Sequence, residues 1–391
     1  MTQTLAKKNL SKMTRDIKDF TSGKFVTQNR YKSFQPEKIN LEWVTSSPKL
    51  QTVMSEADRL IGELNMFSNQ IPNIDLFVSL HRAKEASQSS KIEGTRTNIE
   101  DAFLSEDEVQ EEKRDDWKEV QSYIKAMNDS LTELDKLPLS NRLFKKAHKI
   151  LLENVRGNTK LPGSFRASQN WIGGATINDA VFIPPHHKDV PELMGDLEKF
   201  IHNEEIHVPH LMKIGIVHYQ FETIHPFLDG NGRIGRLIIT LYLVSFGLLK
   251  MPVLYLSDFF EKHKTVYYDN LMKARLSNDM EQWLLFFFTG IIETAKTSIA
   301  TFKKILAMKA EFQQEVMNYG KQAENLNKVM DHLYSFPIID AKKIKEITGV
   351  TTPTVYTIIT ALEKIGVLNE MTGRKRNRMY VFTKYLNLFK T

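Results

Sequence analysis

The stretch from His225 to Arg236, with the sequence HPFLDGNGRIGR, decides the fold of this chain. It holds a histidine, an aspartate, an asparagine, three glycines and two arginines within twelve residues, and a largely apolar run, Leu237–Leu249, follows at once. Glycines let the backbone turn tightly and leave its N–H groups uncovered. A helix that begins after such a turn presents free N–H groups and its positive dipole end to an anion. The stretch therefore predicts a phosphate-binding loop in front of a buried helix.

The side chains of this stretch supply the other parts of a phosphate site. Arg233 and Arg236 are forked cationic donors that match phosphate oxygens. Asp229 can hold Mg²⁺, although an aspartate at a helix entry can also cap that helix. His225 can take a proton near neutral pH. Together these residues indicate a phosphate cradle with its own general base.

The stretch resembles the signature of Fic proteins, H-P-F-x-[DE]-G-N-G-R-x-x-R, and every fixed position matches. The resemblance implies a mainly α-helical core that transfers AMP from ATP, with Mg²⁺ as cofactor, to a Ser, Thr or Tyr hydroxyl of a target protein and of the chain itself. It implies that His225 deprotonates the acceptor hydroxyl and that Asp229 holds Mg²⁺ beside the α- and β-phosphates. The remaining implied ATP contacts are a backbone nest of Gly230, Asn231 and Gly232, Arg233 on the inner phosphates and Arg236 on the γ-phosphate.

A second stretch, Ser89-Ser90-Lys91-Ile92-Glu93-Gly94, resembles the Fic inhibitory motif, [ST]-x-x-x-E-[GN]. In this motif Ser89, Glu93 and Gly94 occupy the fixed positions. Glu93 pointing into the cradle would pair with Arg236 and remove the donor meant for the γ-phosphate. ATP would then bind with its α-phosphate misplaced for in-line attack. We expect an enzyme that is autoinhibited by Glu93, whereas an ordinary exposed helical glutamate is the alternative.

Between residues 157 and 185, glycines and prolines break the helical periodicity and predict a hairpin-like loop. The loop resembles the Fic flap, which docks a target segment as an added strand. Val181, Phe182 and Ile183 would then offer main-chain pairing to an extended peptide. A hairpin that only covers the core is an equally open interpretation.

Tyr267 and Tyr268 match a Tyr-Tyr pair that is common downstream of the signature in Fic proteins. The resemblance implies that Tyr267 lies beside the adenine of ATP. Two adjacent aromatic residues on a helix can equally serve helix packing.

Helical periodicity along the chain predicts three units. These are an N-terminal helical region with the inhibitory helix (1–140), a Fic catalytic core with the β-hairpin flap (141–319), and a C-terminal module (320–391). The first 75 residues look mixed, with loop signals at 46–48 and 70–73. Residues 99–137 form an acidic, helix-favouring stretch.

The C-terminal module resembles a winged helix-turn-helix domain. Helical patterns at 325–334, 341–347 and 352–365 precede a basic hairpin at 368–382. Residues 341–391 carry a net charge of +7, whereas the rest of the chain carries −1. Such modules place their recognition helix, here 352–365, in the DNA major groove and the wing on the backbone. DNA is therefore an expected partner, and a module used only for protein contacts or dimerisation is the alternative.

The composition excludes several other classes of protein. The chain has no cysteine, so disulfides, thiolate nucleophiles and cysteine-bound zinc are excluded. The N-terminus lacks the apolar segment of a signal peptide. The apolar run at 237–256 is interrupted by Lys250 and Pro252 and is shorter than the roughly 20 residues of a membrane span. We expect a cytoplasmic protein with no membrane partner, and a homodimer is left open.

Two other functions fit the same residues. Some Fic relatives remove AMP with the same site, using the inhibitory glutamate to position water. Alternatively, the chain could be a DNA-binding regulator whose Fic core senses a nucleotide. Phosphotransferase activity fits this sequence less well, because Fic relatives with that activity carry lysine at the position of Gly232.

Overall fold

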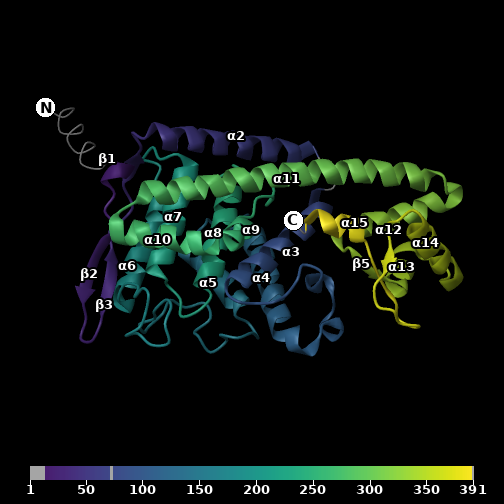
Figure 1. The fold of residues 1–391 in the computed structure, drawn as a ribbon, viewed down its shortest axis with the longest axis horizontal. Coiled ribbons are helices and arrows are strands. Elements are labelled where there is room, and N and C mark those ends of the chain that lie inside the picture. Colours follow the sequence, from purple (N-terminus) through teal and green to yellow (C-terminus); the bar gives the residue numbers. More distant parts are fainter. Residues whose placement is uncertain (1–13, 71–73, 390–391) are drawn as a thin grey trace.

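The computed structural model describes residues 14–70 and 74–389 of the chain. The fold is mainly helical, as the sequence predicts, and elongated (Figure 1). Its two long helices, α2 (Pro48–Gln70) and α11 (Met280–Met317), lie side by side along one edge of the molecule (Figure 1). Below them pack α3 (Ile74–Ile92), α4 (Arg114–Glu133), α5 (Asn141–Leu151), α6 (Val190–His202), α7 (His210–Ile224), α8 (Asn231–Ser245), α9 (Ser257–Lys262) and α10 (Lys264–Ser277).

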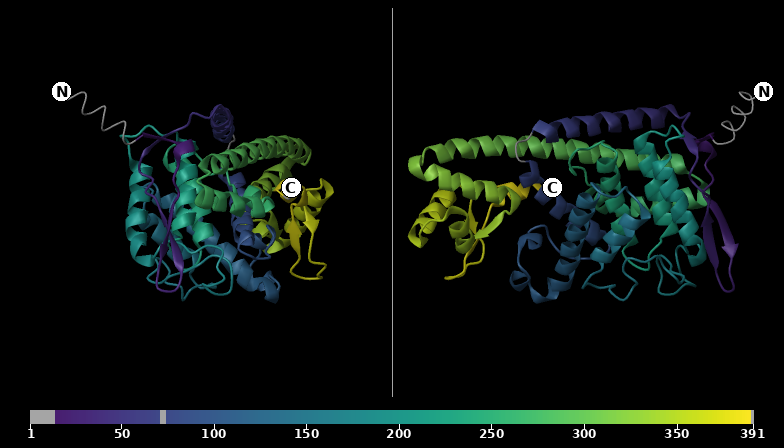
Figure 2. Two further views of the ribbon diagram at one scale, coloured as in Figure 1. Left: turned by 60° about the vertical axis from the view of Figure 1, so that its left-hand side comes forward. Right: turned by 180° about the vertical axis from the view of Figure 1, so that it is seen from behind.

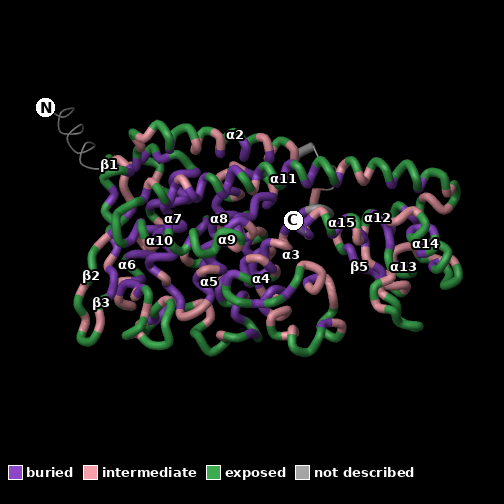
Figure 3. Tube along the Cα trace, viewed as in Figure 1, coloured by how far each residue is buried: buried purple, intermediate pink, exposed green. Residues whose placement is uncertain are grey.

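The core of the molecule is centred on α7 and α8 (Figure 3). Every residue of α7 from Leu211 to Ile224 is buried, and α8 is buried from Arg233 to Leu243. The apolar run that follows the signature forms most of α8, which ends at Ser245. The buried helix expected behind the phosphate loop is therefore present, and it fixes that loop at the centre of the fold.

The strands lie at the two ends of the molecule (Figure 1). Two small sheets precede α2: β1 (Thr14–Asp16) pairs in parallel with β4 (Glu42–Val44), and β2 (Gly23–Thr27) pairs with β3 (Lys32–Pro36) as an antiparallel hairpin. The C-terminal module contains α12 (Ala323–Ser335), β5 (Ile338–Asp340), α13 (Ala341–Thr348), α14 (Thr352–Lys364), β6 (Asn369–Glu370), β7 (Met379–Val381) and α15 (Thr383–Leu386).

The C-terminal module lies at the far end of α11 (Figures 1 and 2). Its antiparallel sheet has the strand order β5-β7-β6. Asp340 caps α13 by accepting a hydrogen bond from the Lys343 backbone N–H at 2.7 Å, and Gly349 ends α13 with a φ of +70°. The module packs against α3 through α12 and the turn Asn387–Phe389. The unit boundaries expected at residues 140 and 319 stay predictions.

Two predictions about the N-terminal half were partly right. The loop expected at 46–48 is present at residues 46 and 47, and α2 starts directly after it at Pro48, where Ser47 Oγ accepts from the Leu50 backbone N–H at 3.3 Å. The acidic stretch begins with three short 3₁₀ turns between residues 101 and 113, and α4 starts only at Arg114. The loop expected at 70–73 falls largely on residues 71–73, which lie outside the described residues.

The helix α11 is apolar and long enough, by composition and length, to cross a membrane. Half of its most apolar window is buried within the fold, against α2, α7, α9 and α10. Its apolar residues are thus accounted for by packing inside the protein.

Candidate functional site

The signature forms a tight turn between α7 and α8. His225 ends α7 in the left-handed region with a φ of +51°, and Gly230 precedes α8 with a φ of +75°. The buried Asn231 side chain closes the turn, because its Oδ1 accepts from the Phe227 N–H and its Nδ2 donates to the Phe227 carbonyl, both at 2.8 Å. Asn231, expected only as part of the backbone nest, therefore also holds the loop in shape.

Two buried residues that the sequence did not single out hold the His225 backbone. Arg166 Nε donates to the His225 carbonyl at 3.0 Å, and its NH2 donates to the Pro185 carbonyl at 2.5 Å. Asn170 Nδ2 donates to the Phe227 carbonyl at 2.9 Å and to that of His225 at 3.3 Å. These bonds offset the strain of a left-handed conformation at a residue with a side chain.

The His225 imidazole is uncharged at neutral pH. Burial lowers the pKa of His225 to about 3, and the nearby guanidinium groups of Arg275 and Arg166 act in the same direction. Its Nδ1 lies 4.0 Å from Oε2 of Glu222, one turn earlier on α7. A neutral imidazole with part of its surface open to the cavity can accept a proton, as a general base must.

Glu222 and Arg275 form a second layer around His225. Burial raises the pKa of Glu222 to about 7, against the opposing effect of Arg236. Glu222 Oε1 has no hydrogen-bond partner among the described residues. Arg275, on α10, donates to the Glu222 carbonyl at 2.9 Å and to Thr223 Oγ1 at 3.1 Å. Glu222 is the only acidic residue of α7, which was a visible signal, whereas Arg275 lies 50 residues away from His225 in the sequence.

A cavity of about 520 Å³ opens in front of this turn. This volume lies within the roughly 300–1,000 Å³ typical of ligand pockets. Four parts of the chain meet there: the signature turn, the end of α3 with Glu93, the flap and α10. Of the sequence-predicted residues, those lining the cavity are Glu93, Val181, Phe182, His225, Asp229, Gly230, Asn231, Gly232, Arg236 and Tyr267.

Glu93 and Arg236 form an ion pair at the cavity wall. Arg236 NH2 donates to Glu93 Oε1 at 2.7 Å and to the Ser89 carbonyl at 2.9 Å, and its Nε donates to Ser89 Oγ at 2.8 Å. Burial would raise the pKa of Glu93, but the charge and hydrogen bond of Arg236 outweigh that effect and lower it. The Arg236 side chain is only 1% exposed, so its guanidinium is held by Glu93 and Ser89 and not by solvent.

The close approach of Glu93 depends on Gly232. A Cβ atom at Gly232 would lie 2.3 Å from Glu93 Oε1 and 2.9 Å from Arg236 NH1. Both distances are shorter than carbon–oxygen and carbon–nitrogen contacts permit. Only glycine at this position allows the glutamate to reach the arginine across the loop.

The end of α3 is fixed by residues near α10. Lys264 Nζ donates to the Ile92 carbonyl at 2.5 Å, and Lys91 pairs with Glu261 at 3.1 Å. The helix stops there, and Gly94 follows with a φ of +108°. The lysine satisfies a free carbonyl in the last helical turn, which carries the negative dipole end.

Asp229 and Arg233 differ in how they face the cavity. The Asp229 side chain is 41% exposed, and its Oδ1 accepts from the Gly230 N–H at 2.5 Å. Arg233 is buried beneath the turn, where NH1 bonds to Glu119 Oε2 at 3.2 Å and NH2 lies 3.6 Å from Asp229 Oδ1. The prediction that Arg233 reaches the inner phosphates has no support in this geometry, because Glu119 on α4 holds its guanidinium.

No group of three or more metal-binding side chains occurs among the described residues. Mg²⁺ does not need one, since it is commonly bound by one or two carboxylates together with substrate phosphates and water. Asp229 fits that role, because its carboxylate is partly exposed and lines the cavity. The backbone of Gly230 and Gly232 at the start of α8 lies beside it.

The flap is a long loop closed by one antiparallel bridge between Ile172 and Phe182. Val181 is 65% exposed, whereas Phe182 is buried beneath Phe34 and the guanidinium of Arg275. The Ile183 carbonyl already accepts a hydrogen bond from the Phe34 N–H of β3 at 2.9 Å. Val181, Phe182 and Ile183 therefore do not form a strand edge whose backbone groups are all free to pair with a peptide. Of the three, only Val181 presents a largely exposed side chain.

Tyr267 is more deeply packed than the sequence suggests. Its ring stacks on Phe260 at a centroid distance of 4.4 Å, and its hydroxyl bonds to His218 Nε2 at 2.8 Å. Tyr268, its neighbour, also lines the cavity and is 40% exposed. Of the two rings, Tyr268 is thus the one with free surface for a base to stack on.

Comparison with known families identifies two regions of the chain. Residues 51–132 match the family model described as Fic/DOC family N-terminal, and residues 138–243 match the model described as Fic/DOC family. The chain therefore carries Fic/DOC family domains in these two regions, and the second contains both His225 and Arg236.

Two individual proteins are similar to this chain in sequence, and one solved structure is similar to it in fold. The chain is 37% identical over 101 residues to "Probable protein adenylyltransferase" of Aquifex aeolicus, covering 26% of this chain and 30% of that protein. It is 30% identical over 158 residues to "Protein adenylyltransferase Fic" of Aedes aegypti, covering 40% and 27% respectively. The matches thus span less than a third of these two relatives. A crystal structure of a Fic family protein from Desulfovibrio desulfuricans shares the fold, with a TM-score of 0.55, 19% identity, and coverage of 87% of this chain and 97% of that one.

Proposed function

We propose that this chain is a protein adenylyltransferase that moves AMP from ATP to a Ser, Thr or Tyr hydroxyl and that Glu93 restrains it. One observation supports the proposal above all. A single cavity is lined by His225, by Arg236 and by the partly exposed carboxylate of Asp229. Glu93 accepts a hydrogen bond from Arg236, the arginine that would bind the γ-phosphate. The names of the two curated relatives point to the same activity.

In the proposed reaction His225 takes the proton of the acceptor hydroxyl as that oxygen attacks the α-phosphorus. The bond from the α-phosphorus to its bridging oxygen breaks, and pyrophosphate leaves. The backbone N–H groups at the start of α8 bind phosphate oxygens in place of water. Asp229 would hold Mg²⁺, which when bound neutralises charge on the phosphates. The low pKa of His225 keeps the base unprotonated before each turnover.

The restraint follows from competition for one guanidinium. A γ-phosphate and the Glu93 carboxylate both need the NH2 group of Arg236. With Glu93 in place at 2.7 Å, the triphosphate must bind elsewhere in the cavity. Its α-phosphate then lies out of line with the attacking hydroxyl, and transfer slows although ATP still binds.

The target segment is proposed to dock along the flap beside Val181. The exposed side chains of Val181 and Trp171 line the cavity and offer apolar contact to an extended peptide. Because Ile183 already pairs with β3, the added strand would take the opposite edge of the flap. This docking requires no sequence-specific contact, so loops of the chain itself are candidate acceptors.

The activity is tested in the Glu93→Gly background with Mg²⁺ and ATP labelled either at the α- or the γ-phosphate. We expect protein labelling from α-labelled ATP alone and its loss on adding His225→Ala. His207→Ala, at an exposed histidine outside the cavity, is the matched control and should leave labelling intact. Labelling from γ-labelled ATP would contradict the proposal. If the Glu93→Gly variant binds ATP without labelling, and the wild type, which keeps Glu93, instead removes AMP from AMP-modified protein, the site removes AMP.

We also propose that residues 320–391 form a winged-helix module that binds duplex DNA. The tip between β6 and β7 carries four exposed basic residues, Arg374, Lys375, Arg376 and Arg378. In the proposed module this tip of the three-stranded sheet would be the wing, and α14 would be the recognition helix. Exposed cations on a wing contact phosphates and position the helix without reading bases.

This second function is tested by fluorescence anisotropy with a labelled duplex at several salt concentrations. Binding should weaken as salt rises, and Arg374→Gln with Arg376→Gln should reduce both the affinity and the salt dependence. Lys304→Gln, an exposed lysine on α11, serves as the matched control. Absence of binding at low salt would leave the module as a protein-contact or dimerisation unit.

A further inference from the structure

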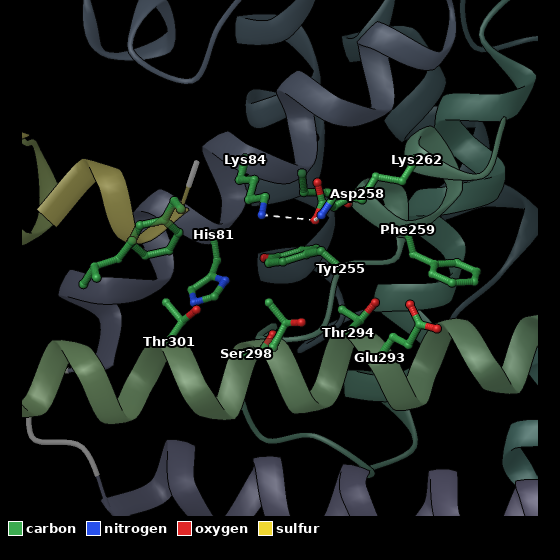
Figure 4. Close-up of a pocket in the computed structure, with 14 residues that line it drawn as sticks. His81, Lys84, Tyr255, Asp258, Phe259, Lys262, Glu293, Thr294, Ser298 and Thr301 are labelled. Carbon is green, nitrogen blue, oxygen red and sulfur yellow. Dashed lines mark ion pairs between the residues drawn. The ribbon is translucent and has the colours of Figure 1, made fainter. Parts of the chain in front are cut away.

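A second cavity, distinct from the candidate nucleotide cavity, lies between α3, α9 and α11, and Figure 4 shows the residues that line it. It has a volume of about 80 Å³ and shares no lining residue with the first cavity. The C-terminal residues Leu388 and Phe389 contribute to its wall. Four parts of the chain that are distant in the sequence therefore build this space together.

Two buried polar atoms facing this cavity have no partner. His81 Nε2 and the Tyr255 hydroxyl make no hydrogen bond to any described residue, although the residues are only 8% and 7% exposed. Leaving such a group unsatisfied costs about 1–3 kcal/mol. Figure 4 shows the Tyr255 hydroxyl turned toward His81 and Lys84. Their convergence indicates that a polar occupant completes the site.

The His81 ring cannot turn away easily to find another partner. It packs against Phe302 and Phe389, with ring centroids 5.0 Å away in both cases. These two rings come from α11 and from the C-terminal turn. The imidazole is thus held with its Nε2 toward the cavity side.

One face of α11 adds a row of hydroxyl donors. Thr294, Thr297, Ser298 and Thr301 line the cavity, and their spacing of three and four residues brings them onto one helical face. Ser298 and Thr301 are buried and point into the same space as His81 (Figure 4). Four hydroxyls on a single cavity wall are unusual for a helix that is otherwise apolar on its buried side.

The charges around the cavity favour an anion at the His81 end. Lys84 and Lys262 share the carboxylate of Asp258, at 3.2 and 3.1 Å, so one cation is in excess. The Glu85 carboxyl is bonded to Ser257 Oγ at 2.5 Å, and burial raises its pKa, which favours its neutral form. The other carboxylate, Glu293, lies near Phe259 at the opposite end (Figure 4).

We infer that this cavity binds a small oxyanion, a phosphate or a carboxylate. Hydroxyl, imidazole and ammonium donors outnumber free acceptors there, and an oxyanion offers only acceptors. The volume suits one such ion and excludes a nucleotide. The ligand would join α3, which also carries Glu93, to α11 and the C-terminal turn.

The test is isothermal titration calorimetry of the full chain with sodium phosphate or sodium acetate, against sodium chloride at equal ionic strength. We expect the wild type to bind one of the two oxyanions. Tyr255→Phe and Ser298→Ala should each weaken that binding about tenfold, as loss of a charge-assisted hydrogen bond does. Thr289→Val is the matched control on α11, since its hydroxyl bonds to the Leu285 carbonyl of its own helix.

Thermal melting in chloride separates a binding role from a folding role. Tyr255→Phe removes an unpartnered hydroxyl, so its melting temperature should equal or exceed that of the wild type. Binding of acetate but not phosphate, with the same pattern across the variants, assigns the site to carboxylates. Equal affinity in all variants, or loss only with Arg236→Gln, puts the anion in the nucleotide cradle and overturns the inference. No binding of either ion also overturns it and leaves ordered water as the occupant.

Discussion

The Arg236 guanidinium holds three hydrogen bonds within one buried corner, two to Ser89 and one to Glu93. Only the bond to Glu93 comes from a side chain that is partly exposed and free to be displaced. A triphosphate can therefore compete for one bond while Ser89 keeps the arginine oriented. At the scale of single residues, the proposed inhibition is competition between the Glu93 carboxylate and the γ-phosphate for the Arg236 guanidinium.

The protonation state of His225 predicts the pH dependence of AMP transfer. Its pKa lies far below the usual value because of burial and two nearby arginines. A base with such a pKa stays unprotonated as the pH falls through the normal histidine range. In Glu93→Gly, the rate of AMP transfer should therefore not fall between about pH 8 and 5.5, although an ordinary histidine becomes protonated near pH 6.5. A rate that halves close to pH 6.5 would contradict this environment.

Glu222 predicts a pH-dependent stability. Its folded-state pKa of about 7 lies above the ordinary glutamate pKa of 4.5, so the unfolded chain releases this proton first as the pH rises. Stability is therefore lost between about pH 4.5 and 7. Glu222→Gln should melt near the wild-type temperature at pH 4.5 and progressively higher than wild type toward pH 7. Glu293→Gln, at an exposed glutamate, is the control, and an equal shift at all pH values would refute the prediction.

Sequence reasoning located the site residues that lie in one contiguous stretch and missed those that support them. His225, Asp229 and Arg236 could be assigned because their spacing itself carries the chemistry. Arg166 and Arg275 could not, since nothing near either residue shows which carbonyl its guanidinium meets. For the same reason the sequence did not indicate that Arg233 pairs with Glu119 on a different helix, and its contact with the inner phosphates stays a prediction.

The end of α3 is the element that carries the restraint, and two neighbouring serines test it. Ser89→Ala removes the hydroxyl that accepts from Arg236 Nε, a charge-assisted bond of about 1.5–3 kcal/mol. Without this hydroxyl Arg236 is oriented less firmly toward Glu93, so the ion pair weakens and AMP transfer should rise. The rise should be about tenfold at most, because Glu93 still holds the arginine. Ser90→Ala is the matched control, since its buried hydroxyl has no partner among the described residues. Equal rates for both variants would exclude Ser89 from the restraint.

Most helices could be predicted from periodicity, and the exceptions have identifiable causes. The helix α2 was missed although Leu50, Ala57, Leu60 and Leu64 recur on one buried face. The serines of Ser-Ser-Pro form the short loop that the sequence predicts, and Pro48 then begins the helix that was missed. The stretch at 101–113 was expected to be helical, but Val109 is its only fully buried residue after Ala102. Acidic composition favours a helix only where an apolar face can also be buried.

At the scale of the whole molecule, α3 contacts both the nucleotide cavity and the C-terminal module. Its end carries Glu93, its middle lines the second cavity, and its Ser79 hydroxyl donates to the Ser335 carbonyl of α12 at 2.7 Å. A rigid helix that touches all three places is a physical connection between them. The division of the chain into three units is therefore not a division into independent parts.

The packing of the C-terminal turn on α3 predicts a loss of stability when Phe389 is truncated. Phe389 is buried and lies edge-on to His81 at 5.0 Å. Phe389→Ala should lower the free energy of unfolding by about 3 kcal/mol. Phe336→Ala, at an exposed phenylalanine of the same module, should change it by less than about 0.5 kcal/mol. Equal effects in chemical denaturation would mean that the turn does not dock on α3.

The central claim is that the residues lining the cavity catalyse AMP transfer and that Glu93 inhibits this activity. It is tested most directly by the initial rate of protein labelling from α-labelled ATP, at saturating Mg²⁺ and ATP, for the wild type and Glu93→Gly. Freeing one preorganised donor for the phosphates should raise the rate about 10²-fold or more. Equal rates in the two proteins, with ATP bound by both, would contradict the account.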